Sequence, residues 1–466
     1  MKELIFNIDQ SWNVPMYQQI YVYIRKKILA GKIAYNTKLP SIRELAKLLN
    51  VSRNTTQVAY EQLLAEGYIR SECKKGYFVQ ANMSNQVLTY EPTLVAHREK
   101  ENDIRKTIDF KIGTVDRENF PITKWRSLAN KALMDPIMYS YGEKQGDMLL
   151  RTAISDYLFQ SRGVSASNEQ ILIGSSTQHL LLILTFLLKE ELNRIAVEDP
   201  GYNGARELFS LQSFSVEPIS VLENGLDVNQ LYTTDARLVY VTPTHHFPLG
   251  LTMPVNERLK LINWAEQVNG YIIEDDYDSE FRYIHQPVPS LHSLDSNERT
   301  VYLSTFSKAL LPSIRVSYMV LPKRLLSRYE KISSLLEQTA SSLHQRTLAH
   351  FISEGYWYAH LRKMKALYKR KIKVLCEEIN KHFKDNIEIK GYYSGIYVVI
   401  EVKTQMSEKD LVSKAFSNGV TVYPCSQYFV KNAPKYPHIQ LGLGNLSELE
   451  ITEGVCKLAN IWLEKN

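Results

Sequence analysis

The residues best suited to chemistry lie in two short segments of the second half of the chain. The first, Ile272 to Phe281, carries Asp275 and Tyr277, and the second contains Lys308, followed seven residues later by Arg315. A lysine amine can form a Schiff base with an aldehyde, and hydroxyls or a guanidinium can hold a phosphate group. A nearby carboxylate can pair with a pyridinium nitrogen. These residue types predict a site for a phosphate-bearing pyridine aldehyde.

Each segment taken alone has a simpler interpretation. A lysine that follows a serine usually lies on a solvated surface, and an Asp-Asp-Tyr-Asp run more often forms an acidic loop or half of a metal site. The combination favours the cofactor, because both segments follow apolar runs typical of strands. In an α/β sheet, ligands bind at the carboxyl ends of the strands.

The surrounding elements predict an α/β domain. Short β runs alternate with amphipathic helices from about residue 108 onward. The candidate strands begin at Ile171, Arg194, Leu238, Tyr271 and Thr300. Strands separated by helices indicate a mostly parallel sheet with helices on both faces. From about residue 345, a long basic helix leads into a smaller α+β subdomain.

The first 80 residues form a different kind of module. They hold 12 Lys/Arg against 6 Asp/Glu, which accounts for the whole net charge of +6. A basic module on a neutral body predicts a polyanionic partner. Helix signals begin at Pro15, at Ser41 and at Ser52, and Ser41 with Glu44 forms a capping box. A tight turn between two short strands follows.

The second and third of these helices predict a helix-turn-helix, whose second helix enters the major groove of DNA with its first residues. The candidate DNA contacts are Ser52, Arg53, Asn54 and Thr56 on that helix, and Lys74 and Lys75 at the hairpin tip. A helix-turn-helix used only for protein contact is the alternative. The local charge excess counts against it.

This module resembles the winged helix-turn-helix of the GntR superfamily. The matching segments are Leu39 to Ala46, Val51 to Thr55, Ala65 to Tyr68 and Gly76 to Val79. The resemblance implies DNA contacts from the position of Arg43, as well as from Arg53, Asn54 and the wing.

The later segments resemble fold-type I pyridoxal 5'-phosphate (PLP) proteins of the aminotransferase class. The whole chain resembles the MocR-type branch of GntR regulators. The resemblance implies that Lys308 forms the internal aldimine with PLP, that Asp275 pairs with the pyridine nitrogen and that Tyr277 bonds the phenolic oxygen. It further implies phosphate or ring contacts from Arg315, Thr305, Ser176, Thr177, Gln178 and Tyr202. It also implies a domain-swapped homodimer.

The departures from this pattern concern the amino-acid carboxylate. Aminotransferases of this class, and GABA-responsive members of the branch, hold that carboxylate with arginines. Here Asn445 stands at the C-terminal arginine position and Gly204 at the other, with Arg206 two residues further on. No neutral residue replaces a bidentate clamp at equal strength. A separate question concerns the two adjacent histidines. Either His245 or His246 lines the site, or the two form a polar pair in a loop.

Composition narrows the remaining possibilities. Hydrophobic residues make up 44% and charged residues 23% of the 466 residues, as is ordinary for a globular protein. The four cysteines form no CxxC pair, which argues against a disulfide framework or a zinc ribbon. The N-terminus shows no signal peptide, and the most apolar run, His179 to Leu188, is too short to span a bilayer. We expect a cytoplasmic protein without a metal.

Together these observations predict a winged helix-turn-helix at residues 1–80, a linker at 81–107, and an aminotransferase-like domain at 108–466 with a small subdomain at about 345–466. The predicted function is a dimeric transcriptional regulator rather than an enzyme. It would bind operator DNA and respond to PLP, or to an amine or amino acid that forms an external aldimine, in vitamin B6 or amino-acid metabolism. One alternative is an active aminotransferase with an attached DNA-binding module. Another is a large domain that has lost the cofactor and only dimerises.

Overall fold

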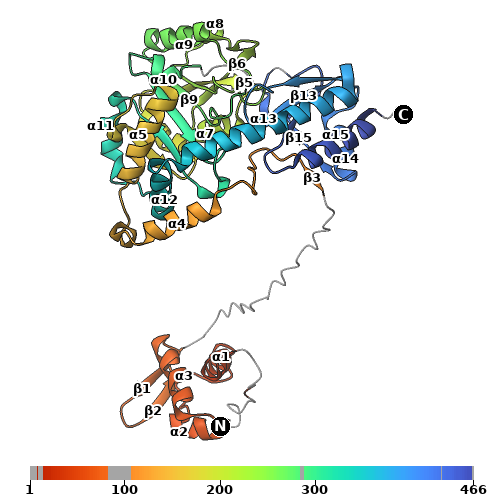
Figure 1. Cartoon of the computed structure of the whole chain (residues 1–466). Helices are drawn as coiled ribbons and strands as arrows, with labels where there is room; N and C mark the ends of the chain where they lie inside the picture. Colours follow the sequence, from red (N-terminus) through yellow and green to blue (C-terminus); the bar gives the residue numbers. More distant parts are fainter. Residues whose placement is uncertain (1–7, 9–13, 82–106, 284–287, 432, 464–466) are drawn as a thin grey trace. The chain divides into compact units, whose positions relative to one another are not determined.

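The computed structural model describes residues 8, 14–81, 107–283, 288–431 and 433–463 (Figure 1). The chain divides into two compact units, Met1–Asn102 and Asp103–Asn466. Of the predicted linker, only Ala81 and Thr107 lie within the described residues. None of the helices in the described part of the chain is both long and apolar enough to cross a membrane.

The N-terminal unit is a three-helix bundle with a β-hairpin. Its elements are α1 (Met16–Leu29), α2 (Ile42–Leu49), α3 (Arg53–Ala65), β1 (Ile69–Glu72) and β2 (Gly76–Val79), and the two strands pair antiparallel. The fully buried side chains of its core include Ile20, Leu45, Ala59, Tyr60 and Leu63. Apolar residues from all three helices meet there, which fixes the helices against one another.

All three predicted helix starts in this unit are confirmed, and α1 begins directly after Pro15. Ser41 caps α2, and its hydroxyl accepts from the Glu44 backbone N–H at 3.2 Å while Glu44 accepts from the Ser41 N–H at 2.8 Å. Ser52 caps α3 by accepting from the Thr55 N–H at 3.1 Å. These bonds satisfy backbone donors that the first helical turn leaves free.

The large unit contains a mostly parallel eight-stranded sheet, as the alternating pattern predicted. In spatial order its strands are β4 (Ile171–Gly174), β11 (Ser317–Val320), β10 (Thr300–Thr305), β9 (Tyr271–Asp275), β8 (Leu238–Val241), β5 (Arg194–Asp199), β6 (Ser215–Leu222) and β7 (Gly225–Leu226). Strands β11 and β7 run antiparallel to their neighbours and the others pair parallel. All five predicted strands are present.

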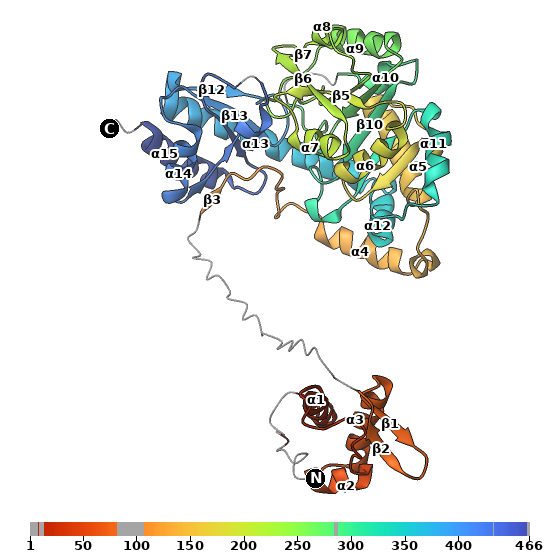
Figure 2. The ribbon, with the colours of Figure 1, turned by 180° about the vertical axis from the view of Figure 1, so that it is seen from behind.

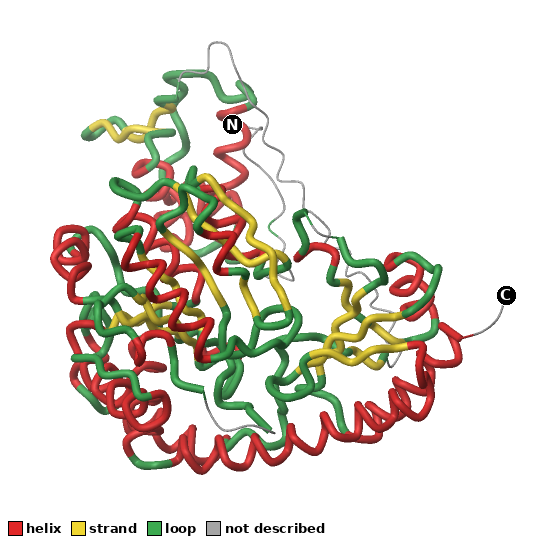
Figure 3. The backbone as a smooth tube through the Cα atoms, turned by 90° about the horizontal axis from the view of Figure 1, so that it is seen from above, coloured by secondary structure: helices red, strands yellow, loops and turns green. Residues whose placement is uncertain are grey.

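Helices cover both faces of this sheet (Figures 2 and 3). One face packs on α6 (Thr177–Leu188), α7 (Asn203–Leu211) and α11 (Lys323–Ser333). The other packs on α8 (Val228–Leu231), α9 (Val255–Gln267), α10 (Leu291–Leu294), α5 (Met148–Arg162) and α12 (Ser342–Ser353). In β8, Leu238 and Tyr240 enter the first core and Val239 and Val241 the second. This double burial explains the continuous apolar runs of the strands.

The smaller subdomain is an antiparallel sheet with helices. Its strands are β12 (Ile387–Lys390), β13 (Tyr397–Val402), β16 (His438–Gly442) and β15 (Tyr423–Pro424), and β14 (Val420–Thr421) pairs with β3 (Ile108–Asp109). Its helices are α14 (Glu408–Ser417) and α15 (Glu448–Leu463). The long helix α13 (Tyr356–Phe383) joins the two parts (Figure 1), since Trp357 packs on Tyr157 and Phe383 on Trp462. Helix α4 (Ile122–Leu133) packs on α12.

One buried ion pair ties α13 to the segment that follows β3. Lys371 Nζ lies 2.8 Å from Asp116 Oδ2, with side-chain exposures of 4% and 11%. Burial alone would raise the pKa of Asp116, but hydrogen bonds from Lys371 and Asn119 hold that pKa below its usual value. The contact therefore stabilises the fold above pH about 4, the pKa of an aspartate in an unfolded chain, and is lost as the pH falls through the lower folded-state pKa.

Asp116→Ala is expected to lower the free energy of unfolding by about 3 kcal/mol near pH 7, because it leaves the buried Lys371 charge without its carboxylate. Denaturant melts at pH 7 and at pH 3 measure the effect. The difference between wild type and variant should shrink at pH 3. An equal difference at both values would show that the carboxylate charge is not the cause.

Candidate functional site

A cavity opens at the carboxyl ends of the central strands of the large sheet. It is lined by Thr177, Tyr202, Tyr240, Thr242, Phe247, Asp275, Tyr277, Thr305 and Lys308. Asp275 ends β9 and Thr305 ends β10, the neighbouring parallel strand. The fold therefore brings the two segments singled out from the sequence to one place, together with residues from three other segments.

Asp275 presents an unpaired oxygen in this cavity wall. Its side chain is buried, Oδ2 accepts a 2.5 Å hydrogen bond from the Tyr240 hydroxyl, and Oδ1 has no hydrogen-bond partner among the described residues. Burial raises the pKa of Asp275 to about 7. A buried carboxylate with a free lone pair fits a protonated ring nitrogen, because the cation would compensate the buried charge.

Lys308 is half-buried in the same cavity, and its amine makes no hydrogen bond to any described residue. Burial lowers the pKa of Lys308, which increases its share of the neutral, nucleophilic form. The backbone of Gly113 closes over the amine, since a Cβ atom at that position would lie 3.3 Å from Nζ. Gly113 has φ +81°, a conformation that favours glycine.

Tyr277 belongs to a buried hydrogen-bonded cluster. Its hydroxyl lies 3.1 Å from His245 Nδ1 and 3.1 Å from the Tyr397 hydroxyl on β13, and His245 Nδ1 lies 2.7 Å from Asp278 Oδ2. The cluster joins the large sheet to the small subdomain. It orients the Tyr277 hydroxyl at the cavity wall, where this hydroxyl could donate a hydrogen bond to a phenolic oxygen of a ligand.

Neither histidine lines the cavity. His245 is part of the cluster around Tyr277, whereas His246 Nε2 lies 3.0 Å from the Pro200 carbonyl oxygen. Burial lowers the pKa of His246 to about 3, so this side chain is neutral at physiological pH. His245 therefore acts through Tyr277, and His246 fixes its own loop to the backbone at Pro200.

Of the residues expected to hold a phosphate, Thr177 and Thr305 line the cavity, and the others do not. Ser176 caps α6 by accepting from the His179 N–H at 3.1 Å, and Thr177 lines the cavity at the start of that helix, where an anion is favoured. Gln178 is exposed. The Thr305 hydroxyl accepts from the Ser317 hydroxyl at 2.9 Å.

Arg315 lies outside the cavity lining. It is exposed, and its Nη1 donates to the Pro312 carbonyl oxygen at 3.4 Å. Reaching a phosphate in the cavity would require another rotamer of this side chain.

Tyr202 lines the cavity and its ring centroid lies 6.4 Å from that of Tyr240 and 5.8 Å from that of Phe247. Burial raises the pKa of Tyr202 to about 12. Gly204 leaves room for this ring, since a Cβ atom there would lie 2.5 Å from the Tyr202 hydroxyl oxygen. A side chain at position 204 in this arrangement would displace Tyr202.

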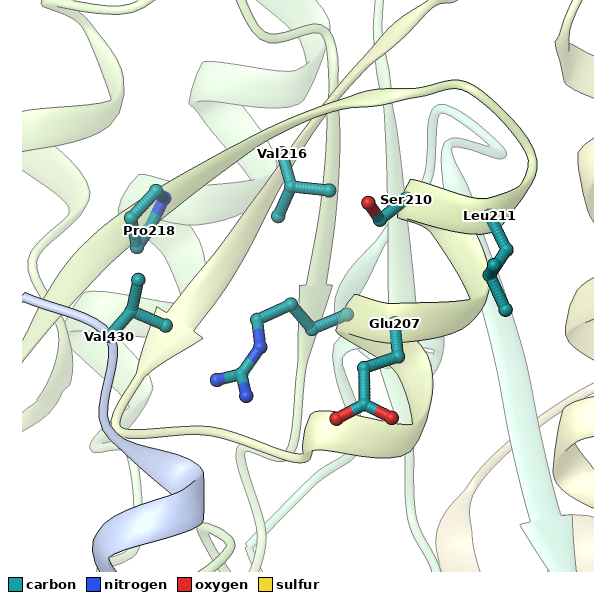
Figure 4. A pocket seen from close by; sticks show the side chains of 7 residues that line it. Glu207, Ser210, Leu211, Val216, Pro218 and Val430 are labelled. Atoms are coloured by element: carbon teal, nitrogen blue, oxygen red, sulfur yellow. The ribbon is translucent and has the colours of Figure 1, made fainter.

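Arg206 does not substitute for an arginine at position 204. Its guanidinium donates to the carbonyl oxygens of Gln427 at 2.9 Å and Tyr428 at 3.4 Å. It lines a separate groove, shown in Figure 4. That groove is formed with Glu207, Ser210, Leu211, Val216, Pro218 and Val430.

Sequence reasoning missed Tyr240, Thr242 and Phe247. Thr242 is anchored by the buried Glu198, whose Oε2 accepts from its hydroxyl at 2.7 Å. Tyr240 lies within a predicted strand and pairs with Ile273, and its hydrogen bond to Asp275 depends on the parallel pairing of β8 with β9. The one signal available was the tyrosine in an otherwise aliphatic run.

In the N-terminal unit, six of the seven candidate DNA contacts are solvent-exposed: Arg43, Ser52, Arg53, Asn54, Lys74 and Lys75. Lys74 and Lys75 lie in the turn between β1 and β2, as predicted. Thr56 was a wrong choice, because its side chain is 0% exposed. It shares the inward face of α3 with Ala59, Tyr60 and Leu63, which follow it at helical spacing.

Comparisons with known proteins agree with both units. The family model "Bacterial regulatory proteins, gntR family" matches residues 16–79, and the model "Aminotransferase class I and II" matches residues 105–451. The HTH-type transcriptional regulator YdeL of Bacillus subtilis is 39% identical over 98% of both chains. The probable rhizopine catabolism regulatory protein MocR of Rhizobium meliloti is 32% identical over 98% of this chain and 95% of its own.

The chain belongs to the MocR-type subfamily of GntR transcriptional regulators.

Two solved structures similar to this MocR-type chain are those of aminotransferases. The multiple substrate aminotransferase of Thermococcus profundus has a TM-score of 0.69 at 24% identity, covering 77% of this chain and 92% of its own. An archaeal alanine:glyoxylate aminotransferase has a TM-score of 0.71 at 22% identity, covering 77% and 91%. These similarities establish the fold of the large unit and, at such identity, nothing of its chemistry.

Proposed function

We propose that this protein is a PLP-dependent regulator in which residues 1–80 bind operator DNA and residues 108–466 bind the cofactor and an effector. The observation that carries the proposal is that Asp275 Oδ1 and the Lys308 amine line one cavity and that neither has a hydrogen-bond partner among the described residues. A carboxylate for a ring nitrogen and an amine for an aldehyde are what PLP requires of a protein. The MocR-type relatives, named as transcriptional regulators, support the regulatory role.

The cavity residues fit PLP in distinct ways. Lys308 would hold the aldehyde carbon, Asp275 would keep the ring nitrogen protonated, and Tyr277 would donate to the phenolic oxygen. The start of α6, with Ser176 and Thr177, would receive the phosphate together with Thr305, whereas the exposed Gln178 and Arg315 would have to turn toward the cavity to contribute. The ring of Tyr202 would stack on the pyridine. When bound, PLP supplies an electrophilic carbon that reacts with primary amines.

A sensing role is favoured over steady transamination. Asn445 and Gly204 stand at the two positions where the resemblance implies carboxylate-binding arginines. Arg206 donates hydrogen bonds to backbone carbonyls instead. The effector is PLP itself or an amine that displaces Lys308. One relative, PdxR of Corynebacterium glutamicum, is named a pyridoxine biosynthesis regulator and is 26% identical over 91% of both chains. It supports a link to vitamin B6.

We also propose that the protein acts as a homodimer. Large apolar side chains stand exposed between α4 and α5, with Met134 at 83%, Tyr139 at 87% and Tyr141 at 98% exposure. Such a group of side chains is typical of a surface that a protein partner covers. A dimer would also match paired operator half-sites.

Binding to the DNA upstream of the protein's own gene tests the proposal. Footprints and affinities are compared for cofactor-free protein, for protein with PLP, and for protein with PLP and a panel of amines. We expect two half-sites and a change in affinity of about 5- to 150-fold on ligand binding. A change with PLP alone identifies a vitamin B6 sensor, and a change only with an amine identifies amine sensing.

Two other results would contradict the proposal. Operator binding that is indifferent to every ligand would mean that the large domain does not regulate the first. Steady turnover of an amino donor with a keto acid would instead identify a working aminotransferase.

A further inference from the structure

A second, larger cavity lies beside the Lys308 cavity. It measures about 610 Å³, against about 120 Å³ for the cavity that contains Lys308. It is lined by Thr114, Val115, Arg117, Glu118, Phe120, Ile122, Leu311, Pro312 and Asn445. Two chain segments run from one cavity to the other. Gly113 precedes Thr114, and a Cβ atom on Gly113 would lie 3.3 Å from Lys308 Nζ, while Leu311 follows Lys308 by three residues.

The walls that carry Arg117 and Asn445 are held together. Lys371 binds Asp116 Oδ2 at 2.8 Å and the Gly444 carbonyl oxygen at 3.2 Å. The two backbones are in contact, because a Cβ atom at Gly444 would lie 2.0 Å from the Thr114 carbonyl oxygen. Each anchored residue immediately precedes a cavity residue, so the positions of Arg117 and Asn445 relative to each other are well determined.

Arg117 is a cation without a partner in the part of the chain that the structure describes. It is exposed and makes no hydrogen bond or ion pair with the described residues. Arg346, by contrast, pairs with Asp135 and Asp147, whereas Arg126, Arg324 and Arg362 resemble Arg117 in having no ion pair within the described residues. Glu118 lines the same cavity, and no ion pair joins it to Arg117 within the described part of the chain. A free guanidinium suits a carboxylate, which it can bind through two hydrogen bonds.

We propose that Arg117 binds the acidic group of the effector, in place of the arginine that is missing at Asn445. The effector class is then a primary amine that carries a carboxylate, with its amine toward Lys308 and its carboxylate in the second cavity. The apolar wall of Val115, Phe120 and Leu311 contacts the carbon chain between the two groups. This inference rests on the proposed binding of PLP by the neighbouring cavity.

The test uses stable adducts in which PLP is reductively joined to an amine, so that no reaction on the protein is needed. Three matched pairs are titrated into the cofactor-free full-length protein: the adducts of glycine and ethylamine, of β-alanine and propylamine, and of 4-aminobutyrate and butylamine. Each pair differs only by a carboxylate in place of a methyl group. The measured quantity is the ratio of the two dissociation constants in wild type, R117Q and the control K111Q.

In wild type, at least one carboxylate adduct should bind roughly ten- to a hundredfold more tightly than its alkyl partner, as expected for a charge-assisted bond. In R117Q the ratio for that pair should fall to about one while the alkyl adduct keeps its affinity. K111Q removes an exposed positive charge of the same segment that does not line the cavity, and should keep the wild-type ratio.

The outcomes distinguish a failure of the proposed PLP site from a failure of Arg117 as the carboxylate receptor. Failure of every adduct to bind would reject the PLP site itself. Adducts that bind without any preference for the carboxylate, or a preference that R117Q retains, would reject Arg117 as the carboxylate receptor while leaving PLP binding intact. An equal loss of preference in K111Q would show that the preference comes from the general positive charge of this surface and not from Arg117. As a second variant, E118Q should tighten the carboxylate adduct, because it removes a like charge from the same cavity.

Discussion

Lys308→Ala is expected to abolish the covalent PLP adduct that borohydride reduction traps in the wild-type protein. Among the described residues, Lys308 is the one lysine that lines the cavity, so its amine is the one expected to attach the aldehyde. Mass spectrometry of the reduced protein and loss of the visible absorbance of bound PLP measure the effect. Operator binding by the cofactor-free variant should stay within about twofold of wild type, since Lys308 forms no hydrogen bond that the fold depends on.

Lys189→Ala is the matched control, because Lys189 is an exposed lysine at the end of α6. It should retain the full adduct. An adduct that persists in Lys308→Ala would place the attachment on another lysine and remove the main support for the proposed site. Loss of operator binding in the same variant would instead show that the two functions are not separable.

The second large effect is expected from the DNA-binding helix. Arg53→Ala should weaken operator binding by roughly ten- to a hundredfold, because Arg53 is exposed in the first turn of α3, where a recognition helix meets base edges. Fluorescence anisotropy at fixed salt, with operator and scrambled DNA, provides the measurement. The loss should be larger for the operator than for the scrambled sequence.

Thr56→Val serves as the control within the same helix. Thr56 is fully buried and its hydroxyl has no partner among the described residues, so the isosteric valine should leave DNA affinity within about twofold. Lys74→Ala at the hairpin tip should weaken binding to both DNA sequences alike and reduce the salt dependence by about one charge. Equal losses on both sequences in Arg53→Ala would assign that residue to phosphate contact alone.

The difference between Arg53 and Thr56 illustrates the limits of residue type as a guide. Both are polar residues near the start of one helix, and both can hydrogen-bond DNA. Their roles diverge because α3 turns by about 100° per residue, which places Thr56 on the face that packs against the other helices. The order of polar residues was visible in the sequence, but the orientation of the helix on its neighbours was not.

The contacts of the arginines were likewise not visible in the sequence. The missing arginines at Asn445 and Gly204 were apparent from the sequence. That Arg206 contacts backbone carbonyls, while Arg117 shares a cavity with Asn445, depends on contacts between segments more than 200 residues apart. Local patterns carry no information on such contacts.

The sequence by itself determined the two-part architecture, the strands and caps, the basic character of the first 80 residues and the identity of Asp275, Tyr277 and Lys308 as candidates. These properties follow from local periodicity, capping and composition, which act over a few residues. Only the tertiary structure decided that Tyr240 occupies one oxygen of Asp275, that His245 and Tyr397 orient Tyr277, and that Arg117 remains free beside the site. Those outcomes depend on strand pairing and on the packing of the small subdomain, where distant residues meet and compete for the same partners.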